Sequence, residues 1–173
     1  MGTAIEVRRL DELGAAEING LAAVLDDCVQ GGASVSFMQP MSPAKAAAYW
    51  HGVAEAVRRG ECRVLAAVDG AGEILGTVTL VLKQPENQPH RADVAKMLVH
   101  RRARNQGIGA RLLTAVEAEA RRCGKTLLVL DTASEAAARV YARGGWQLVG
   151  EIPDYALWPD GGLCATTVFY KRL

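Results

Sequence analysis

The sequence lacks a strong net charge, closely spaced cysteines and a long apolar run. Its 173 residues carry 20 Lys and Arg against 19 Asp and Glu, which gives a formal net charge of +1. No global field therefore attracts nucleic acid or an anionic membrane, and any anion site must be local. No apolar run reaches the length of a membrane span. The first residues have no basic segment followed by an apolar one, so we expect no signal peptide.

Cysteine and histidine are too few and too scattered to indicate a metal centre. The sequence has four cysteines and three histidines, namely Cys28, Cys62, Cys123, Cys164, His51, His90 and His100. No two cysteines have the C-x-x-C spacing, and a zinc site needs three or four converging ligands. We therefore expect no metal, and we expect the reduced, mostly buried thiols of a cytoplasmic protein.

The spacing of apolar residues and turn residues predicts groups of strands and helices. We expect strands over 4–9, 62–69, 73–82, 91–99, 126–131, 146–150 and 163–171. We expect helices over 14–29, from Pro43 up to Gly60, over 107–122 and from Ser134 up to Gly144, and a loop over 152–162. This order does not alternate as in a doubly wound sheet, and its central hairpins imply a mixed sheet. The fold class is therefore α/β (α+β), in one domain that spans residues 1–173.

Local signals predict where helices begin and which side chains face solvent. Ser42, which precedes a proline, and Ser134 are typical N-cap residues. Glu117 and Arg121, four positions apart, predict an ion pair on the solvent face of their helix. Residues 31–41 (GGASVSFMQPM) read as a loop whose apolar side chains must be hidden or must line a ligand site.

The stretch RRARNQGIGARLL (101–113) places basic residues and glycines where a strand passes into a helix. A helix N-terminus has about four unpartnered N–H groups and roughly half a positive charge. Gly107 and Gly109 let an anion approach that backbone, and Arg104 adds a guanidinium that binds phosphate. The sequence after the glycines excludes the ATP-type P-loop, and Leu112 stands where the dinucleotide fingerprint needs a third glycine. The alternative is a solvated turn before a core helix.

Residues 104–110 (RNQGIGA) match the pattern Arg-x-x-Gly-x-Gly/Ala, which resembles the coenzyme-binding turn of the GCN5-related N-acetyltransferases, the GNAT family. A second segment, 134–146 (SEAAARVYARGGW), resembles the family's later helix, in which Tyr141 stands four residues before a Gly-aromatic pair. Trp146 replaces the usual phenylalanine, and Ser134 replaces the common asparagine. The resemblance covers nearly the whole chain. It implies a GNAT-like, mostly antiparallel sheet of about seven strands flanked by about four helices, with acetyl-coenzyme A (acetyl-CoA) as co-substrate and no metal.

The same resemblance implies roles for individual residues. It implies coenzyme contacts from Met97, Leu98, Val99, Arg104, Asn105, Gln106, Gly107, Ile108, Gly109, Ala110, Ser134, Ala137 and Tyr141. Tyr141 is the candidate general acid that stabilises the departing thiolate, and a core tyrosine is the ordinary alternative. Asp131, at the end of a buried strand, competes with Asp93 for the role of base, and either carboxylate can instead bind the substrate ammonium. The residues expected to bind the acceptor are Phe37, Met38, Asp93, Asp131 and Trp158.

A narrower resemblance concerns the acceptor. The segments GGASVSFM, NQPHRADVAKMLV, LVLDTASEAAARVY and YALWPDGG together look like the tabtoxin resistance acetyltransferase and its relatives, which acetylate a toxic amino-acid-like β-lactam. This implies direct transfer, in a ternary complex, to the primary amine of a small molecule, with an antibiotic-resistance or self-protection role. The alternatives are acetylation of a protein or peptide N-terminus and a non-catalytic acetyl-CoA sensor. We expect no nucleic-acid or membrane partner, and a monomer or a homodimer.

Overall fold

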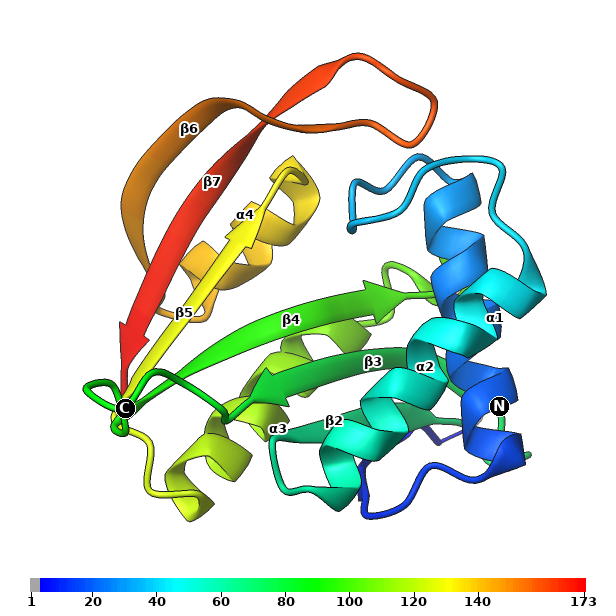
Figure 1. Cartoon of the computed structure of the whole chain (residues 1–173), viewed down its shortest axis with the longest axis horizontal. Coiled ribbons are helices and arrows are strands. Elements are labelled where there is room, and N and C mark those ends of the chain that lie inside the picture. The colour runs from blue at the N-terminus through cyan, green and yellow to red at the C-terminus, as the bar shows by residue number, and fades with distance from the viewer. Residues whose placement is uncertain (1–3) are drawn as a thin grey trace.

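The computed structural model describes residues 4–173, which form a seven-stranded sheet with two helices on each face (Figure 1). The strands are β1 (Glu6–Leu10), β2 (Cys62–Val68), β3 (Ile74–Val81), β4 (Arg91–Val99), β5 (Leu127–Thr132), β6 (Gln147–Leu157) and β7 (Leu163–Arg172). The helices are α1 (Ala15–Gln30), α2 (Pro43–Arg58), α3 (Ile108–Arg122) and α4 (Glu135–Arg143), with a short 3₁₀ helix (Arg101–Ala103) before α3. The expectation about a signal peptide concerns residues that lie partly outside the described range.

The strand order in the described chain is β1-β2-β3-β4-β5-β7-β6. All neighbouring strands run antiparallel except β4 and β5, which run parallel. Helices α1 and α2 cover one face, and α3 and α4 cover the other (Figure 1). The predicted α/β (α+β) fold with a mixed, mostly antiparallel sheet is therefore confirmed.

The parallel strands β4 and β5 pair over only a short distance. Their register joins Arg91–Asp93 to Leu127–Val129, although β4 continues to Val99 and β5 to Thr132. Beyond Asp93 the two strands diverge (Figure 1). The main-chain groups on this edge of β4 therefore have no partner from β5, and backbone N–H and C=O groups require a hydrogen-bond partner.

A β-bulge distorts β4 within its diverging part. Thr77 pairs with Leu98 and Thr79 with Ala95, so that Lys96 and Met97 together oppose one residue of β3. Lys96 has a φ of 50°, in the left-handed region that non-glycine residues seldom adopt. Bulges are common next to active sites, where they redirect a side chain.

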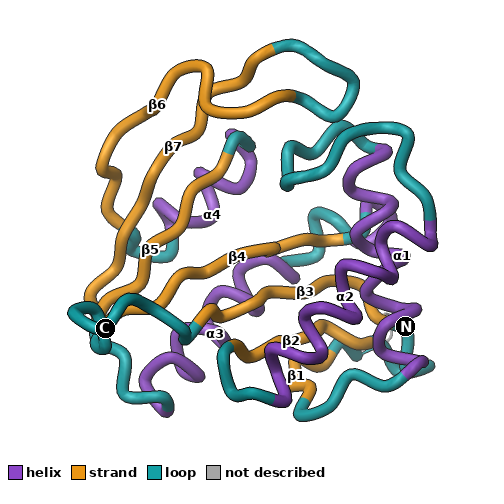
Figure 2. The backbone as a smooth tube through the Cα atoms, viewed as in Figure 1, coloured by secondary structure: helices purple, strands orange, loops and turns teal. Residues whose placement is uncertain are grey.

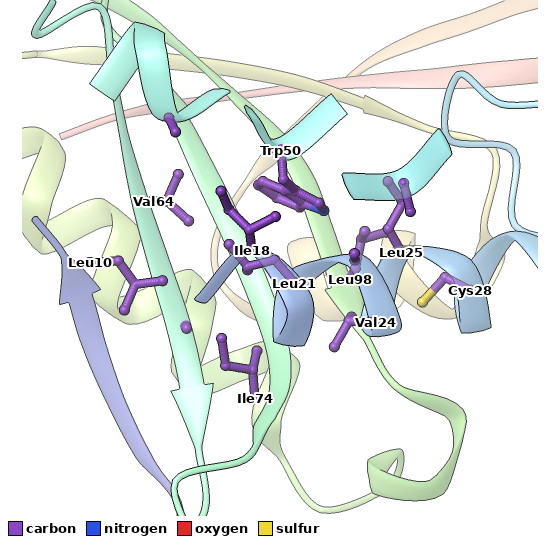
Figure 3. Close-up of a cluster of buried hydrophobic side chains, with 14 of the residues drawn as sticks. Leu10, Ile18, Leu21, Val24, Leu25, Cys28, Trp50, Val64, Ile74 and Leu98 are labelled. Atoms are coloured by element: carbon purple, nitrogen blue, oxygen red, sulfur yellow. The ribbon is translucent and has the colours of Figure 1, made fainter. Parts of the chain in front are cut away.

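Apolar clusters on the two faces of the sheet hold the helices in place. Under α1 and α2, the fully buried Trp50 belongs to the same cluster as Leu21, Leu25 and Leu98 (Figure 3). On the opposite face, Tyr141 of α4 belongs to the cluster beneath α3. Burying an aliphatic side chain stabilises the fold by roughly 1.5–3 kcal/mol, so packing fixes both helix layers beside the diverging strands.

The predicted helix starts agree with the structure. Ser42 Oγ accepts a hydrogen bond of 3.1 Å from the N–H of Lys45, and Ser134 Oγ accepts one of 3.2 Å from the N–H of Ala137. Each hydroxyl satisfies one of the N–H groups that a helix start leaves without a partner.

The predicted loop over 152–162 is wrong in its first part, because β6 extends to Leu157. This strand lies at the edge of the sheet, and nearly all its side chains are exposed. It therefore lacks the alternation of apolar and polar residues by which a half-buried strand is recognised. Gly150 and Pro153 lie where the pairing of β6 with β7 shifts register, and an edge strand tolerates both there.

The prediction that Glu117 faces solvent and pairs with Arg121 is also wrong. Glu117 is buried and accepts hydrogen bonds from Trp146 Nε1 at 2.9 Å and from Lys171 Nζ at 2.8 Å. The partners come from segments far along the chain, so helical spacing alone could not identify them.

The cysteines, the possible metal ligands and the helix lengths also bear on function. All four cysteines are free thiols, and three of them are buried, as predicted. Among residues 4–173, no cluster of three or more His, Cys, Asp or Glu side chains is suited to a metal ion. No helix in that range is both long and apolar enough to cross a membrane.

Candidate active site

The turn before α3 leaves an open space beside a free helix N-terminus. Gly107 is the N-cap residue with a φ of 73°, and Asn105 has a φ of 61°. No side chain caps the helix, so the N–H groups of its first turn remain available. A Cβ added at Gly107 would meet nothing within 4 Å, and one added at Gly109 would meet only Val140 Cγ1, at 4.0 Å. The turn thus has the donors and the space that a pyrophosphate needs.

The arginines of this stretch differ in their partners. Arg101 forms an ion pair of 3.0 Å with Asp27, and Arg102 forms one of 2.7 Å with Glu73. Arg104 Nε donates to the carbonyl of Val99 at 3.3 Å, and no carboxylate among residues 4–173 pairs with its guanidinium. Arg104 is therefore the residue whose remaining N–H groups can bind an anion.

The residues predicted to contact the coenzyme along β4 lie in the diverging part of the strand. Leu98 is buried against the α1 and α2 cluster, whereas Met97 and Val99 pack against the α3 cluster. The carbonyl of Val99 also accepts a weak hydrogen bond from Cys28 Sγ at 3.5 Å. The side chains belong to the core, and residues 97–99 lie beyond the part of β4 that pairs with β5.

Tyr141 occupies the α3 and α4 face beside the end of β5. Its ring packs against Trp146 and Phe169, with centroid separations of 5.9 and 5.8 Å. Burial raises the pKa of Tyr141 above its ordinary value, and the negative charge of Asp131 raises it further. The phenol is consequently protonated at neutral pH. Ser134 and Ala137, also predicted to contact the coenzyme, lie at the start of the same helix.

Asp131 lies on the other face of the sheet from Tyr141. Leu128 and Leu130 of β5 point into the α3 cluster, so alternation along the strand directs Asp131 toward the α1 and α2 face. Its carboxylate is exposed, and Oδ2 accepts a hydrogen bond of 2.7 Å from Thr166 Oγ1 on β7. Oδ1 has no partner among the described residues, so one oxygen of Asp131 is available to a ligand.

Asp93 is held differently. Its Oδ1 accepts from Arg91, and its Oδ2 accepts from Gln84 Nε2 at 3.1 Å. It lies at the last position where β4 and β5 still pair. Both oxygens therefore have partners, and Asp93 stands at the closed end of the gap rather than between the diverging strands.

The apolar residues predicted to bind the acceptor, Phe37, Met38 and Trp158, come from two loops that are joined by hydrogen bonds. The N–H of Gln39 donates to the carbonyl of Pro159 at 2.8 Å, and Ser34 Oγ donates to the carbonyl of Leu157 at 3.0 Å. These contacts bring the loop over 31–42, which carries Phe37 and Met38, against the β6–β7 turn, which carries Trp158 (Figure 2). The arrangement explains how a loop so rich in apolar residues is held in place.

Sequence reasoning missed Lys96. Its half-buried ammonium lies beside Phe37 and donates a hydrogen bond of 3.1 Å to Ser36 Oγ. The available signal was a lysine inside the otherwise apolar second half of the strand, VAKMLV (94–99).

The structure thus combines a helix start with free N–H groups, a gap between parallel strands, and a carboxylate and a phenol on opposite faces of the sheet, which are features expected of a transferase that uses a nucleotide thioester. A family model described as the acetyltransferase (GNAT) family matches residues 32–146. The chain belongs to this family, and it is an acetyl-CoA-dependent N-acetyltransferase of the GNAT type.

Individual relatives share this architecture over nearly the whole chain. The chain is 29% identical over 175 residues to an uncharacterized N-acetyltransferase in the hisH-hisA intergenic region of Azospirillum brasilense, covering 91% of this chain and 98% of that protein. The structure of yncA from Salmonella typhimurium with its cofactor acetyl-CoA has a TM-score of 0.80 at 18% identity, covering 99% of this chain and 95% of that one. A phosphinothricin acetyltransferase from Sinorhizobium meliloti in complex with acetyl-CoA has a TM-score of 0.80 at 16% identity, covering 98% and 88%. Because these two structures are less than 25% identical to this chain, their similarity shows a shared fold and nothing further.

Proposed function

We propose that the enzyme transfers the acetyl group of acetyl-CoA directly to the primary amine of a small molecule. The observation that carries this proposal is the position of Asp131 and Tyr141 on opposite faces of the sheet, beside the gap between β4 and β5. The reaction removes a proton from the amine and returns one to the thiolate, so it suits one group on each side. The chain acts as one domain in the cytoplasm, a compartment that keeps its free cysteines reduced.

In this proposal, the turn and the diverging strand hold acetyl-CoA, which supplies an activated acetyl group. Residues 104–110 bind the pyrophosphate through the N–H groups at the start of α3 and through the guanidinium of Arg104. The main chain of residues 97–99, beyond the part of β4 that pairs with β5, binds the pantetheine arm, and an N–H group there polarises the thioester oxygen. Ser134 and Ala137 contact the coenzyme from the start of α4.

We assign the acceptor amine to Asp131. Its Oδ1 is free, whereas both oxygens of Asp93 are engaged by neighbouring side chains. An α-amino group has a pKa of about 8, so part of it is neutral at pH 7 and a strong base is unnecessary. Asp131 binds the amino group, whose neutral form attacks the thioester carbon, and its carboxylate accepts the proton that the nitrogen loses as the C–N bond forms and the C–S bond breaks. Asp93 contributes through its position at the closed end of the gap.

Tyr141 acts on the opposite side as the general acid. A free phenol has a pKa of about 10 and a thiol about 8.5, so complete transfer to an isolated thiolate is uphill. Burial makes Tyr141 a still weaker acid. Its role is therefore a hydrogen bond that stabilises the charge developing on sulfur, coupled to loss of the amine proton.

In this proposal the two joined loops and the end of β5 line the acceptor site, which has both apolar and charged walls. Phe37, Met38 and Trp158 supply apolar surface, and Asp131 supplies charge. The segments that resemble the tabtoxin resistance acetyltransferase support an amino-acid-like acceptor and a resistance or self-protection role. A sensor without activity would have no use for the phenol and carboxylate that flank the gap.

The proposal is tested by measuring free thiol release from acetyl-CoA with amino acids, amino-acid-like β-lactams, aminoglycosides and polyamines. The expected result is turnover of at least one small amine that Asp131→Asn lowers by about 100-fold or more. Asp93→Asn serves as the matched control and changes the rate much less. Turnover only of a protein or peptide N-terminus would contradict the proposal.

A further inference from the structure

The ammonium of Lys96 lies beside two aromatic rings but has no anionic partner among the described residues. Its Nζ lies 5.6 Å from the ring centroid of Tyr49 and 6.0 Å from that of Phe37. The two rings meet edge to face, with a centroid separation of 5.3 Å. An ammonium at these distances is attracted to the ring faces, which limit where its charge can lie. The rings therefore position Nζ, although they offer it no anionic partner.

The hydrogen bonds of this ammonium are also incomplete. A lysine ammonium has three donors, and Ser36 Oγ is the acceptor for one of them. No carboxylate among residues 4–173 lies within ion-pair distance of Nζ, although Asp131 is close enough for its charge to favour the ammonium form. Burial acts in the opposite direction and lowers the pKa of Lys96. A half-buried cation without an ion-pair partner is costly, and a bound anion relieves that cost.

The backbone is strained at both residues that form the hydrogen bond, Lys96 and Ser36. Lys96 has a φ of 50° in the β-bulge of β4, and Ser36 has a φ of 79° in the loop after α1. Left-handed conformations of non-glycine residues persist only where the surrounding structure enforces them, and they concentrate at ligand sites. The loop is enforced by its hydrogen bonds to the β6–β7 turn. Two strained residues therefore meet in one hydrogen bond at the acceptor side of the gap.

The geometry points to Lys96 as a second anchor for the acceptor: we propose that its ammonium binds a carboxylate of the acceptor molecule. This inference rests on the proposed function, because it concerns the same acceptor site. Asp131 and Lys96 occupy the same face of the sheet, on the two strands that diverge. Opposite charges that are near but unpaired suit a zwitterion, with its amino group at Asp131 and its carboxylate at Lys96. The acceptor class is therefore amino acids and their analogues with a free carboxylate.

The test compares acceptors in matched pairs, each an amino acid and the same amine without its carboxylate, such as lysine with 1,5-diaminopentane and phenylalanine with phenethylamine. Wild-type enzyme is expected to prefer a carboxylate-bearing member by about tenfold or more in kcat/KM, since a charge-assisted hydrogen bond is lost with the carboxylate. Lys96→Met is expected to abolish that preference mainly through KM, to leave the amine partner within about twofold, and to leave the acetyl-CoA affinity unchanged. Lys96→Arg should retain much of the preference.

Lys45→Met is the matched control. Lys45 Nζ also lies 6.0 Å from the Phe37 ring, but its side chain is exposed and starts from α2. Its substitution should leave the preference intact. Equal or better turnover of the amine without its carboxylate overturns the inference while the proposed function stands. Failure of every small amine, in a protein that acetyl-CoA still stabilises, overturns both.

Discussion

Thr166 Oγ1 donates a hydrogen bond of 2.7 Å to Oδ2 of Asp131, across the pairing of β7 with β5. Thr166 is buried, so this contact fixes the orientation of the carboxylate and leaves Oδ1 directed away from it. The strand pairing that closes the sheet thus also orients the group that we assign to the acceptor amine.

Substitution of Thr166 by valine tests this orientation. Thr166→Val keeps the shape of the side chain and removes the donor, so kcat/KM for the acceptor should fall about fivefold to tenfold, as expected for a lost hydrogen bond to a charged group. The affinity for acetyl-CoA should not change. Thr167→Val is the matched control, because alternation directs that neighbour to the opposite face of β7. Equal losses in both variants, measured by steady-state kinetics, would show that Thr166 only supports the strand.

Tyr141→Phe tests the assignment of the acid. We expect kcat to fall by about 100-fold or more, with the KM for acetyl-CoA nearly unchanged, because the phenylalanine ring preserves the packing against Trp146 and Phe169. The phenol has no hydrogen-bond partner among the described residues, so the free energy of unfolding should change little. An unchanged kcat would remove Tyr141 from the mechanism.

The raised pKa of Tyr141 also predicts the pH dependence of the reaction. A group whose pKa is raised holds its proton to higher pH, and a free phenol already titrates only near pH 10. The kcat at saturating substrates should therefore show no loss between pH 7 and about pH 9. A decline in that range that disappears in Tyr141→Phe would mean that the phenol titrates far lower than its burial implies.

Glu119 predicts how stability depends on pH. Its carboxylate is buried on α3 and pairs with Arg9 at 3.0 Å and with Arg122 at 2.8 Å. Burial pushes the pKa of Glu119 upward, but the hydrogen bonds from Arg122 and Arg9 outweigh burial and hold the pKa below its usual value. A lowered pKa means that the carboxylate stabilises the fold above about pH 4.5 and that this stabilisation is lost as the pH falls through the folded-state value.

Thermal unfolding of Glu119→Gln and wild-type protein at several pH values checks this account. At pH 7 the variant should unfold at a lower temperature, because it leaves the arginines without their shared partner. Between pH 6 and pH 3 the wild-type Tm should fall more steeply than that of the variant. Parallel curves would mean that Glu119 does not contribute to acid sensitivity.

Much of the fold followed from local signals in the sequence. Helix starts at Ser42 and Ser134 were identified because the capping hydroxyl, the first turn and the apolar stripe lie within a few residues of one another. The glycine turn was recognisable for the same reason. The free N–H groups that we assign to phosphate, the positive φ of Gly107 and the helix start all belong to one short segment.

The features that were missed depend on residues far apart in the chain. Glu117 was placed in solvent because its partners Trp146 and Lys171 come from the C-terminal strands. The strand predicted over 146–150 ends too early, because β6 is an exposed edge strand and has no buried face that an apolar pattern would mark. Lys96 gains its role from a β-bulge and from Ser36, which lies 60 positions earlier. Neither hydrophobic periodicity nor motif spacing records such contacts.

The proposed function depends on binding of acetyl-CoA at the turn that contains Gly107. This binding is tested most directly by matched substitutions at the two ends of α3. Gly107 and Gly124 flank the helix with φ values of 73° and 72°, and a Cβ at either position meets nothing within 4 Å. Glu at either position adopts the same unfavourable φ, costing about 1–2 kcal/mol, but only Gly107→Glu places a carboxylate in the pyrophosphate site.

The measurement is the rise in Tm on adding acetyl-CoA to wild-type protein, Gly107→Glu and Gly124→Glu. We expect a clear rise for wild-type protein and for Gly124→Glu, and none for Gly107→Glu at millimolar acetyl-CoA, because the new side chain fills the site and its charge repels the ligand. A rise in Gly107→Glu equal to that in Gly124→Glu would contradict the account.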